Sequence, residues 1–317
     1  MLGATILNAN AGTDPAHQYD YHETIVTSQK VNWRIEDITG GDKQLDFSKR
    51  FMPEALARVD ELSFLNDDEK RILNQIRGHA YLSSFGLVEE FILPFVIDHV
   101  RPSLADDDYR VRAFLQFASE EAKHIQLFKV FRSEFRKGFG TECKVIGPPA
   151  AVAKEILGHD PFGVALTILH IEWMSQRHYI DSIKDDTNID AQFKSLLKNH
   201  WIEEAQHAKL DMRMVEDLAS QLTPAEIVNG VDEYLAIGAF LDDGAKQQVL
   251  FDLEAFEAET GRILSDEERE EFIDVQNQAN RYTYIGSGMT HPKFLEAIGN
   301  LDPEQRARIE AIGPVFS

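Results

Sequence analysis

The sequence contains the same spaced pattern of acidic and imidazole side chains twice. In each copy a single glutamate is followed, after 32 residues, by Glu-x-x-His, and the second copy repeats the first at a constant offset of 83 residues. The six residues of the two copies are Glu89, Glu121, His124, Glu172, Glu204 and His207. Because residues three or four apart share one face of an α-helix, each Glu-x-x-His directs both side chains the same way. The repeat therefore predicts two equivalent helical hairpins that face a common centre.

Helical periodicity surrounds these residues. The apolar pattern predicts a first helix over 67–100, stopped by Arg101-Pro102 and kinked at Pro94. A second helix is predicted over 106–136, a third that begins at Pro148 or Pro161 and ends near residue 183, and a fourth over 190–220. Four long helices with acidic and imidazole side chains near their middles predict an all-α, ferritin-like four-helix bundle over 67–220.

The rest of the chain is expected to flank this bundle. Residues 1–66 are predicted to form an N-terminal arm with a short helix, partly extended over 23–27, with a turn at Gly40-Gly41. Residues 221–317 are predicted to be a C-terminal helical extension, with helices over 224–240, 243–260 and 265–280, a loop over 286–292 and a last short helix. Because no Pro/Gly/Ser-rich linker separates these parts, 1–317 is expected to be one domain.

The register of the first helix decides between two neighbouring glutamates. Glu89 lies at the centre of an apolar stripe that includes Phe85 and Leu93, whereas Glu90 lies roughly 100° around the helix. A carboxylate inside such a stripe is costly unless it is paired or coordinated. Glu172 occupies the same kind of position, between Ile168 and Tyr179. We therefore predict Glu89 and Glu172, and not Glu90, as members of the site.

Composition limits the kind of site. Cys143 is the only cysteine, which excludes an internal disulfide and a cysteine-ligated iron-sulfur cluster within one chain. The formal net charge of −22 disfavours nucleic acid as a partner. The first residues lack the pattern of a secretory signal, and the longest apolar run, over 91–97, is too short to cross a bilayer. We expect a cytoplasmic protein without a membrane span, in which any metal is bound by oxygen and nitrogen.

Four carboxylates and two imidazoles suit two iron ions, because anionic oxygen ligands neutralise and bridge the pair while each imidazole holds one ion. Glu121 and Glu204 are predicted to bridge, and Glu89 and Glu172 to bind terminally. Dioxygen is then the expected co-substrate, and the sequence leaves open manganese in place of one iron. No cofactor-binding residue and no catalytic residue beyond the metal ligands is predicted.

Two further residues on the fourth helix face the same way. His200 precedes Glu204 by four residues and is predicted as a third nitrogen ligand; the alternative is a core histidine bonded to a carboxylate. Asp211, four residues after His207, is predicted to accept a hydrogen bond from a ligand imidazole, or else to be a surface aspartate. The remaining histidines lack such support and are expected to be structural or exposed. They are His17, His22, His79, His99, His159, His170, His178 and His291.

With His200-x-x-x-Glu204-x-x-His207, the ligand pattern resembles the non-haem di-iron p-aminobenzoate N-oxygenases. The resemblance covers about 67–215, and the segment Gly286-Ser287-Gly288-Met289-Thr290-His291-Pro292 extends it. It implies dioxygen-dependent oxidation of a small organic substrate such as an (aryl)amine, with electrons from a ferredoxin or reductase. A homodimer is compatible with the pattern. The substrate itself is not identified by the resemblance.

Four other functions compete with this interpretation. A ribonucleotide reductase small subunit is expected to carry a radical tyrosine one turn after the first ligand histidine, where this chain has Phe128. An iron-storage ferritin does not need a long C-terminal extension. A di-iron hydroxylase or desaturase acting on carbon is the main alternative, and it differs chiefly in whether His200 binds metal. A structural bundle with buried His/Glu pairs would bind no metal at all.

Overall fold

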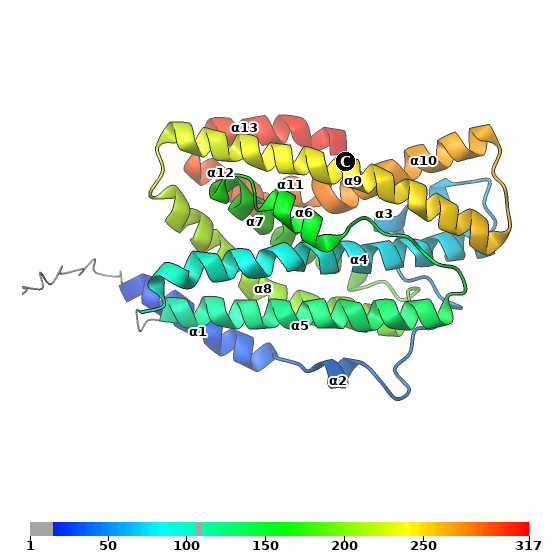
Figure 1. Ribbon diagram of the computed structural model, residues 1–317, viewed down its shortest axis with the longest axis horizontal. Coiled ribbons are helices and arrows are strands. Elements are labelled where there is room, and N and C mark those ends of the chain that lie inside the picture. The colour runs from blue at the N-terminus through cyan, green and yellow to red at the C-terminus, as the bar shows by residue number, and fades with distance from the viewer. Residues whose placement is uncertain (1–14, 106–108, 317) are drawn as a thin grey trace, which may run out of the picture.

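The computed structural model describes residues 15–105 and 109–316, and its regular secondary structure in these ranges is helical, apart from two isolated β-bridges. The fold is all-α and ferritin-like, as predicted. Figure 1 shows the long helices lying roughly parallel to one axis, with the C-terminal helices stacked above the central bundle and α1 and α2 below it.

Four long helices form the centre of the molecule. They are α4 (Asp67–Val100), α5 (Tyr109–Gly138), α7 (Pro161–Arg177) and α8 (Ala191–Ala219). α4 packs along α5 and α7 packs along α8, which gives the two predicted hairpins. A π-helical turn, His178–Ile183, extends α7, and the separate short helix α6 (Pro149–Ile156) resolves the ambiguous start of the third helix. The predicted helix ends agree with the structure to within three residues for 67–100, for 190–220 and for the end of 106–136, whose predicted start lies outside the described residues.

Local signals in the sequence set these helix ends. Asn66 caps α4 by accepting from the backbone N–H groups of Asp68 and Glu69, while the Glu69 side chain accepts from the Asn66 backbone. Asp160 and Asp190 cap α7 and α8 by accepting from the backbone N–H groups of Phe162 and Phe193. These caps satisfy N–H groups that have no partner within the helix, so α4, α7 and α8 each begin at a defined residue. α4 runs through Pro94 without ending, and the kink predicted there stays a prediction.

The N-terminal arm differs from the sequence expectation. Residues 23–27, expected to be extended, lie inside α1 (Pro15–Val31), which packs against α5 and α8. Tyr21, Ile25 and Ser28 are buried in that contact. The packing of this face outweighs the preference of the β-branched residues for strands. The turn at Gly40-Gly41 is confirmed, because both glycines have positive φ.

Short elements connect the arm to the bundle and continue into the extension. The arm contains α2 (Ile35–Ile38), α3 (Glu54–Ala57) and a 3₁₀ turn, Val59–Glu61, and a second 3₁₀ turn, Arg101–Ser103, follows α4. The extension consists of α9 (Pro224–Thr260), α10 (Asp266–Arg281), a π-helical turn (Tyr282–Gly286), α11 (Ser287–Met289), α12 (Pro292–Leu301), α13 (Pro303–Ile312) and a final 3₁₀ turn (Gly313–Phe316).

The extension corrects two further expectations. α9 is one continuous helix where two were predicted, over 224–240 and 243–260, because Asp242 is held by Arg281 and Lys246 instead of breaking the helix. The predicted loop over 286–292 is largely helical and packs against α7. α9 covers both α4 and α7, so the extension buries one side of the bundle.

α4 and the turn after it form a helix of 37 residues, Asp67–Ser103, that is long and apolar enough to cross a membrane by length and composition. The uninterrupted apolar run over 91–97, which was used in the sequence analysis, is much shorter than this helix. However, 61% of its most apolar window is buried inside the molecule. The apolar character of α4 is therefore that of a helix at the centre of a bundle.

Candidate metal centre

All seven residues predicted for the site are buried in the middle of the bundle. Glu89 comes from α4, Glu121 and His124 from α5, Glu172 from α7, and His200, Glu204 and His207 from α8, and none is more than 5% exposed. By contrast, the side chain of Glu90 is 30% exposed and faces Lys129 at 3.5 Å. The register chosen on the first helix is therefore the one that the fold adopts.

The structure brings six of these residues into two overlapping groups of potential metal ligands. Within each group, one ligand atom from every residue lies within 4.8 Å of the others. The first group is Glu89, His124, His200 and Glu204, and the second is Glu121, His124, Glu204 and His207. Sharing of Glu204 is the arrangement expected of a carboxylate between two ions. Glu172 belongs to neither group, but its carboxyl is hydrogen-bonded to that of Glu204.

The donor set fits metal ions because several of its polar atoms face one another without being hydrogen-bonded. Both oxygens of Glu121, Oε1 of Glu204 and Nδ1 of His124 are buried and lack a hydrogen-bond partner. Yet His124 Nδ1 lies 3.0 Å from Glu204 Oε1, and His207 Nδ1 lies 2.8 Å from Glu121 Oε1. Atoms this close but poorly aligned for hydrogen bonds are aimed at common points between them. Buried carboxylates without partners are costly, and cations between them remove that cost. These residues could hold two metal ions.

The other ring nitrogen of each repeated histidine is fixed by a carboxylate from the opposite hairpin. His124 Nε2, on α5, lies 2.9 Å from Glu203 Oε2 on α8, and His207 Nε2, on α8, lies 2.9 Å from Glu120 Oε2 on α5. A carboxylate in this position keeps the proton on Nε2 and leaves the Nδ1 lone pair free to bind metal. These exchanged contacts hold both imidazoles in ligand geometry.

Glu120 and Glu203 were missed by the sequence analysis, although the signal was present. Each directly precedes a predicted bridging glutamate, and the two are separated by the same 83 residues as the rest of the pattern. Both are buried, at 3% and 0% exposure. The repeated unit is thus Glu-Glu-x-x-His, in which the first carboxylate is hydrogen-bonded to the histidine of the other copy.

Residues around α1 support these outer carboxylates. Ser28 Oγ donates a hydrogen bond to Glu120. Lys123 forms an ion pair with Glu203, and its Nζ lies 4.1 Å from the centre of the Trp33 ring. The Trp33 ring is stacked on His124 with a centroid distance of 6.1 Å, and its Nε1 donates to the backbone oxygen of Asn199. The N-terminal arm therefore helps to position the centre.

His200 lies where a third nitrogen ligand was predicted. Its Nε2 is 3.1 Å from Glu204 Oε1 and 3.2 Å from Glu89 Oε1. Burial, opposed by Glu204, lowers the pKa of His200 to about 4. The imidazole is thus neutral at pH 7 and has a lone pair available for a metal. Its role as a ligand stays a prediction.

The pKa values of His124 and His207 are shifted in the opposite direction to that of His200. Burial disfavours their charged forms, but Glu204, together with Glu121 and the outer carboxylates, raises the pKa of His124 and of His207 well above the usual value. The same site raises the pKa of Glu172 well above its usual value, through burial and the nearby charge of Glu204. The carboxylates therefore favour positive charge at the centre, which metal ions also supply.

The prediction for Asp211 was wrong. Its carboxyl is fully buried, but both oxygens lack a hydrogen-bond partner, and His207 is bonded to Glu120 instead. The alternative of a surface aspartate is equally excluded. Burial raises the pKa of Asp211 well above its usual value, which favours the protonated carboxylic acid. Helix spacing placed this residue near the site but did not identify the stronger acceptor from the other hairpin.

Among the described side chains, no histidine outside the pattern belongs to a ligand group. His79, His170 and His178 are buried but belong to neither ligand group. The side chain of His17 lies outside the described side chains, whereas His22 is exposed.

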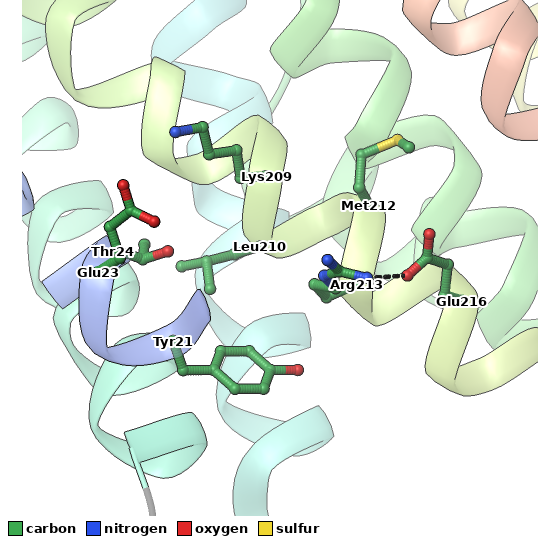
Figure 2. A pocket seen from close by; sticks show the side chains of 8 residues that line it. All are labelled: Tyr21, Glu23, Thr24, Lys209, Leu210, Met212, Arg213 and Glu216. Atoms are coloured by element: carbon green, nitrogen blue, oxygen red, sulfur yellow. Dashed lines mark hydrogen bonds and ion pairs between the residues drawn. The ribbon is translucent and has the colours of Figure 1, made fainter. Parts of the chain in front are cut away.

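A separate pocket of about 290 Å³ opens between α1 and α8 (Figure 2). Tyr21 and Leu210 lie toward its middle, with Lys209 at one side and the Arg213–Glu216 ion pair at another. None of the seven predicted site residues lines it. It is distinct from the buried centre.

Neither the protein-family models nor the curated proteins include a match to this sequence. Among solved structures, a single-residue variant of the R2-like ligand-binding oxidase with an anaerobically reconstituted Mn/Fe cofactor is similar over 88% of this chain and 97% of that chain, with 13% identity and a TM-score of 0.46. Another variant of that oxidase, with a non-activated Mn/Mn cofactor, is similar over 86% and 94%, with 15% identity and a TM-score of 0.44. Such distant similarity carries no information about this chain's reaction, so the functional argument rests on the geometry of its own residues.

Proposed function

We propose that this protein is a di-iron oxidase that activates dioxygen to oxidise a small organic substrate. The observation that carries the proposal is the convergence of four buried residues, Glu121, His124, Glu204 and His207, whose group includes carboxylate oxygens of Glu121 and Glu204 and the His124 Nδ1 atom that lack hydrogen-bond partners. A purely structural bundle would gain nothing from unpaired carboxylates in its core. Two bound ferrous ions would supply the two electrons for the first reduction of dioxygen.

The side chains would prepare the site for this chemistry. Glu121 and Glu204 would lie between the two ions and, with Glu89 and Glu172, balance their charge. Glu203 and Glu120 hold the proton on the outer nitrogen of each repeated histidine, so that Nδ1 faces the metal position.

Aromatic side chains keep water away from the same region. Phe117 is stacked on His207 with a centroid distance of 4.1 Å, and Phe128 lies 5.0 Å from the ring of His200. Both phenylalanines are buried. A dry, apolar surrounding strengthens charge interactions within the site and limits unproductive reaction with solvent.

We further propose N-oxygenation of an (aryl)amine as the reaction, with a ferredoxin or reductase as the electron donor. Support comes from His200, whose ring nitrogen lies within 3.2 Å of two candidate ligand carboxylates and is neutral. A third nitrogen donor separates the proposed class from carbon hydroxylases and desaturases. Phe128, in place of a tyrosine, argues against a ribonucleotide reductase small subunit.

Metal content tests the first part of the proposal. After expression with iron and manganese supplied, elemental analysis should find about two transition-metal ions per chain, mostly iron. Glu121→Ala and Glu204→Ala should each lose metal and remain helical by circular dichroism, whereas Glu90→Ala should keep its metal. Metal-free wild-type protein under these conditions would contradict the proposal.

Oxygen consumption and product analysis test the reaction. The loaded protein is reduced anaerobically, mixed with dioxygen, and followed with aromatic amines or with matched hydrocarbons that lack the amine. Hydroxylamine or nitro products from the amines alone support N-oxygenation. Oxidation of carbon in both series would instead assign the enzyme to the hydroxylases, and binding of two ions without oxygen consumption would refute the oxidase.

A further inference from the structure

A chain of buried hydrogen bonds joins α4, the end of α7 and the C-terminal extension. Tyr81 Oη lies 2.9 Å from His178 Nδ1, His178 Nε2 lies 2.9 Å from Ser287 Oγ, and Ser287 Oγ lies 2.9 Å from the backbone oxygen of Thr283. The side chains of Tyr81, His178 and Ser287 are at most 3% exposed. None of them belongs to the predicted metal site.

The partners of this chain fix its protons. The backbone oxygen of Thr283 can only accept, so the Ser287 hydroxyl donates to it and its oxygen accepts from His178. The proton of the neutral imidazole therefore lies on Nε2, and Nδ1 accepts from the Tyr81 hydroxyl. Burial lowers the pKa of His178 to about 3, which keeps Nδ1 unprotonated at neutral pH. Tyr81 thus has a free base in contact with its phenolic proton.

Tyr81 is also connected to the metal centre by aromatic contacts. Its ring lies 4.4 Å from that of Phe85, and the ring of Phe85 lies 5.5 Å from that of His200, measured between centroids. Burial, with Tyr284 and Glu204, raises the pKa of Tyr81 well above its usual value, so the phenol is neutral. One buried phenylalanine therefore lies between a protonated tyrosine and a candidate ligand.

The backbone around the chain is unusual. His178 opens one of the two π-helical turns in the described ranges, and Ser287 directly follows the other, Tyr282–Gly286. Arg177 ties the two segments together by donating to the backbone oxygen of Ser287 and to Thr290 Oγ1. π-helical turns are rare and occur frequently at functional sites. Here both turns border the contact between His178 and Ser287.

We propose that Tyr81 and His178 form a redox pair that gives one electron to the oxidised metal centre while one proton moves from Tyr81 to His178 within the pair. The O–H bond of Tyr81 breaks; its electron passes through the Phe85 contact to the oxidised centre, its proton moves to His178 Nδ1, and a neutral phenoxyl radical remains. The external electron donor later returns the electron, and His178 returns the proton. This inference rests on the proposed oxidase function and adds an oxidising equivalent stored outside the metal ligands.

A second buried tyrosine–histidine pair provides a matched control. Tyr234 Oη lies 2.8 Å from His170 Nδ1, but in the described chain the ring of Tyr234 contacts those of His170 and Phe294, and neither of these rings contacts a histidine of the metal site. Tyr234→Phe removes the same kind of hydrogen bond without removing a route to the centre. It should leave the radical unchanged.

The test uses electron paramagnetic resonance of samples frozen at short times. Reduced, iron-loaded wild type is mixed with dioxygen in the absence of substrate, and metal content and oxygen consumption are measured on the same samples. We expect a tyrosyl radical in wild type and Tyr234→Phe but not in Tyr81→Phe, with equal metal content in all three. His178→Gln, which keeps an acceptor but not a base, should slow radical formation by about 100-fold, and deuterated solvent should slow it in wild type.

A second arm separates this inference from the proposed function. Metal-free protein is oxidised with a photogenerated ruthenium(III) complex, and the radical is compared between wild type and Tyr81→Phe. A Tyr81 radical here, with no oxygen consumption by the loaded protein, would support the pair and overturn the oxidase. Oxygen consumption without a Tyr81 radical in either arm would overturn the pair alone, and failure of both measurements would overturn both.

Discussion

At the scale of single residues, the site depends on the glutamates that orient its histidines. Glu203→Gln should weaken metal binding by about 10- to 100-fold, because a neutral amide holds the Nε2 proton of His124 less strongly than a carboxylate does. Titration of metal-free protein with ferrous ion under anaerobic conditions measures this change. Glu216→Gln, which alters an exposed glutamate on the same helix, should bind as wild type does. Unchanged affinity in Glu203→Gln would show that the outer carboxylate is dispensable.

The sequence predicted the inward-facing residues better than the contacts between them. The pattern of a single helix was enough to choose Glu89 over Glu90, because Glu89 lies on the apolar side of that helix. Helix spacing gives direction, but it does not say which side chain arrives from another helix. For this reason Asp211 was predicted to accept a hydrogen bond from a ligand imidazole, whereas the carboxylate that contacts His207 Nε2 is Glu120, from another helix. Partners across helices require the packed fold.

At the scale of elements, α7 and α9 touch through two glycines. A Cβ added at Gly163 would lie 2.6 Å from Glu233 Cβ and 3.0 Å from the backbone oxygen of Gly230, closer than packed atoms allow. Gly163→Ala should therefore lower the free energy of unfolding by about 1–3 kcal/mol. Gly238→Ala, on α9 with no atom within 4 Å of its added Cβ, should raise it by up to about 1 kcal/mol through helix propensity. Urea unfolding measures both, and equal effects would contradict the close contact.

Two of the wrongly predicted elements, α1 and α9, have a common cause. α1 contains β-branched residues, and α9 contains Asp242-Asp243-Gly244, so local preference argued against a continuous helix in both. Packing reversed it: Ile25 of α1 is buried, and Asp242 is paired with Arg281 of α10. The four core helices were predictable because their apolar stripes and their caps agree with the packing. Where local and tertiary preferences conflict, a single sequence gives no way to weigh them.

At the scale of the whole molecule, a buried ion pair connects the bundle to its extension. Arg77 of α4 lies 3.6 Å from Asp252 of α9, and both side chains are at most 2% exposed. Arg77→Leu would leave the Asp252 carboxyl without its cation and should cost about 3–5 kcal/mol of stability. Burial, only partly offset by Arg77, already raises the pKa of Asp252 to about 6. The cost should thus be larger at pH 8 than at pH 5, where protonation removes the charge; equal losses at both pH values in urea unfolding would refute this account.

Buried histidines should make the whole fold sensitive to acid. Burial, together with Arg132 and Arg136, lowers the pKa of His79 from 6.5 to about 3. Between these values the unfolded chain binds a proton that the folded chain does not, so stability falls as pH decreases from 6.5. As the pH falls through this window, the free energy of unfolding of wild type should decrease by about 1.4 kcal/mol per pH unit more than that of His79→Leu. Urea unfolding from pH 6.5 to 4 checks this difference, and the same pH dependence in both proteins would contradict the account.

The exchanged contacts Glu120–His207 and Glu203–His124 have a consequence for how the metal centre can be assembled. Expressed separately, either half of the bundle would have a histidine with no acceptor for its outer nitrogen, and would bind iron poorly even if it folded. Competence for metal should appear only when the two halves dock. The two halves are thus mutually dependent, and a change in one outer glutamate acts first on the histidine of the other half.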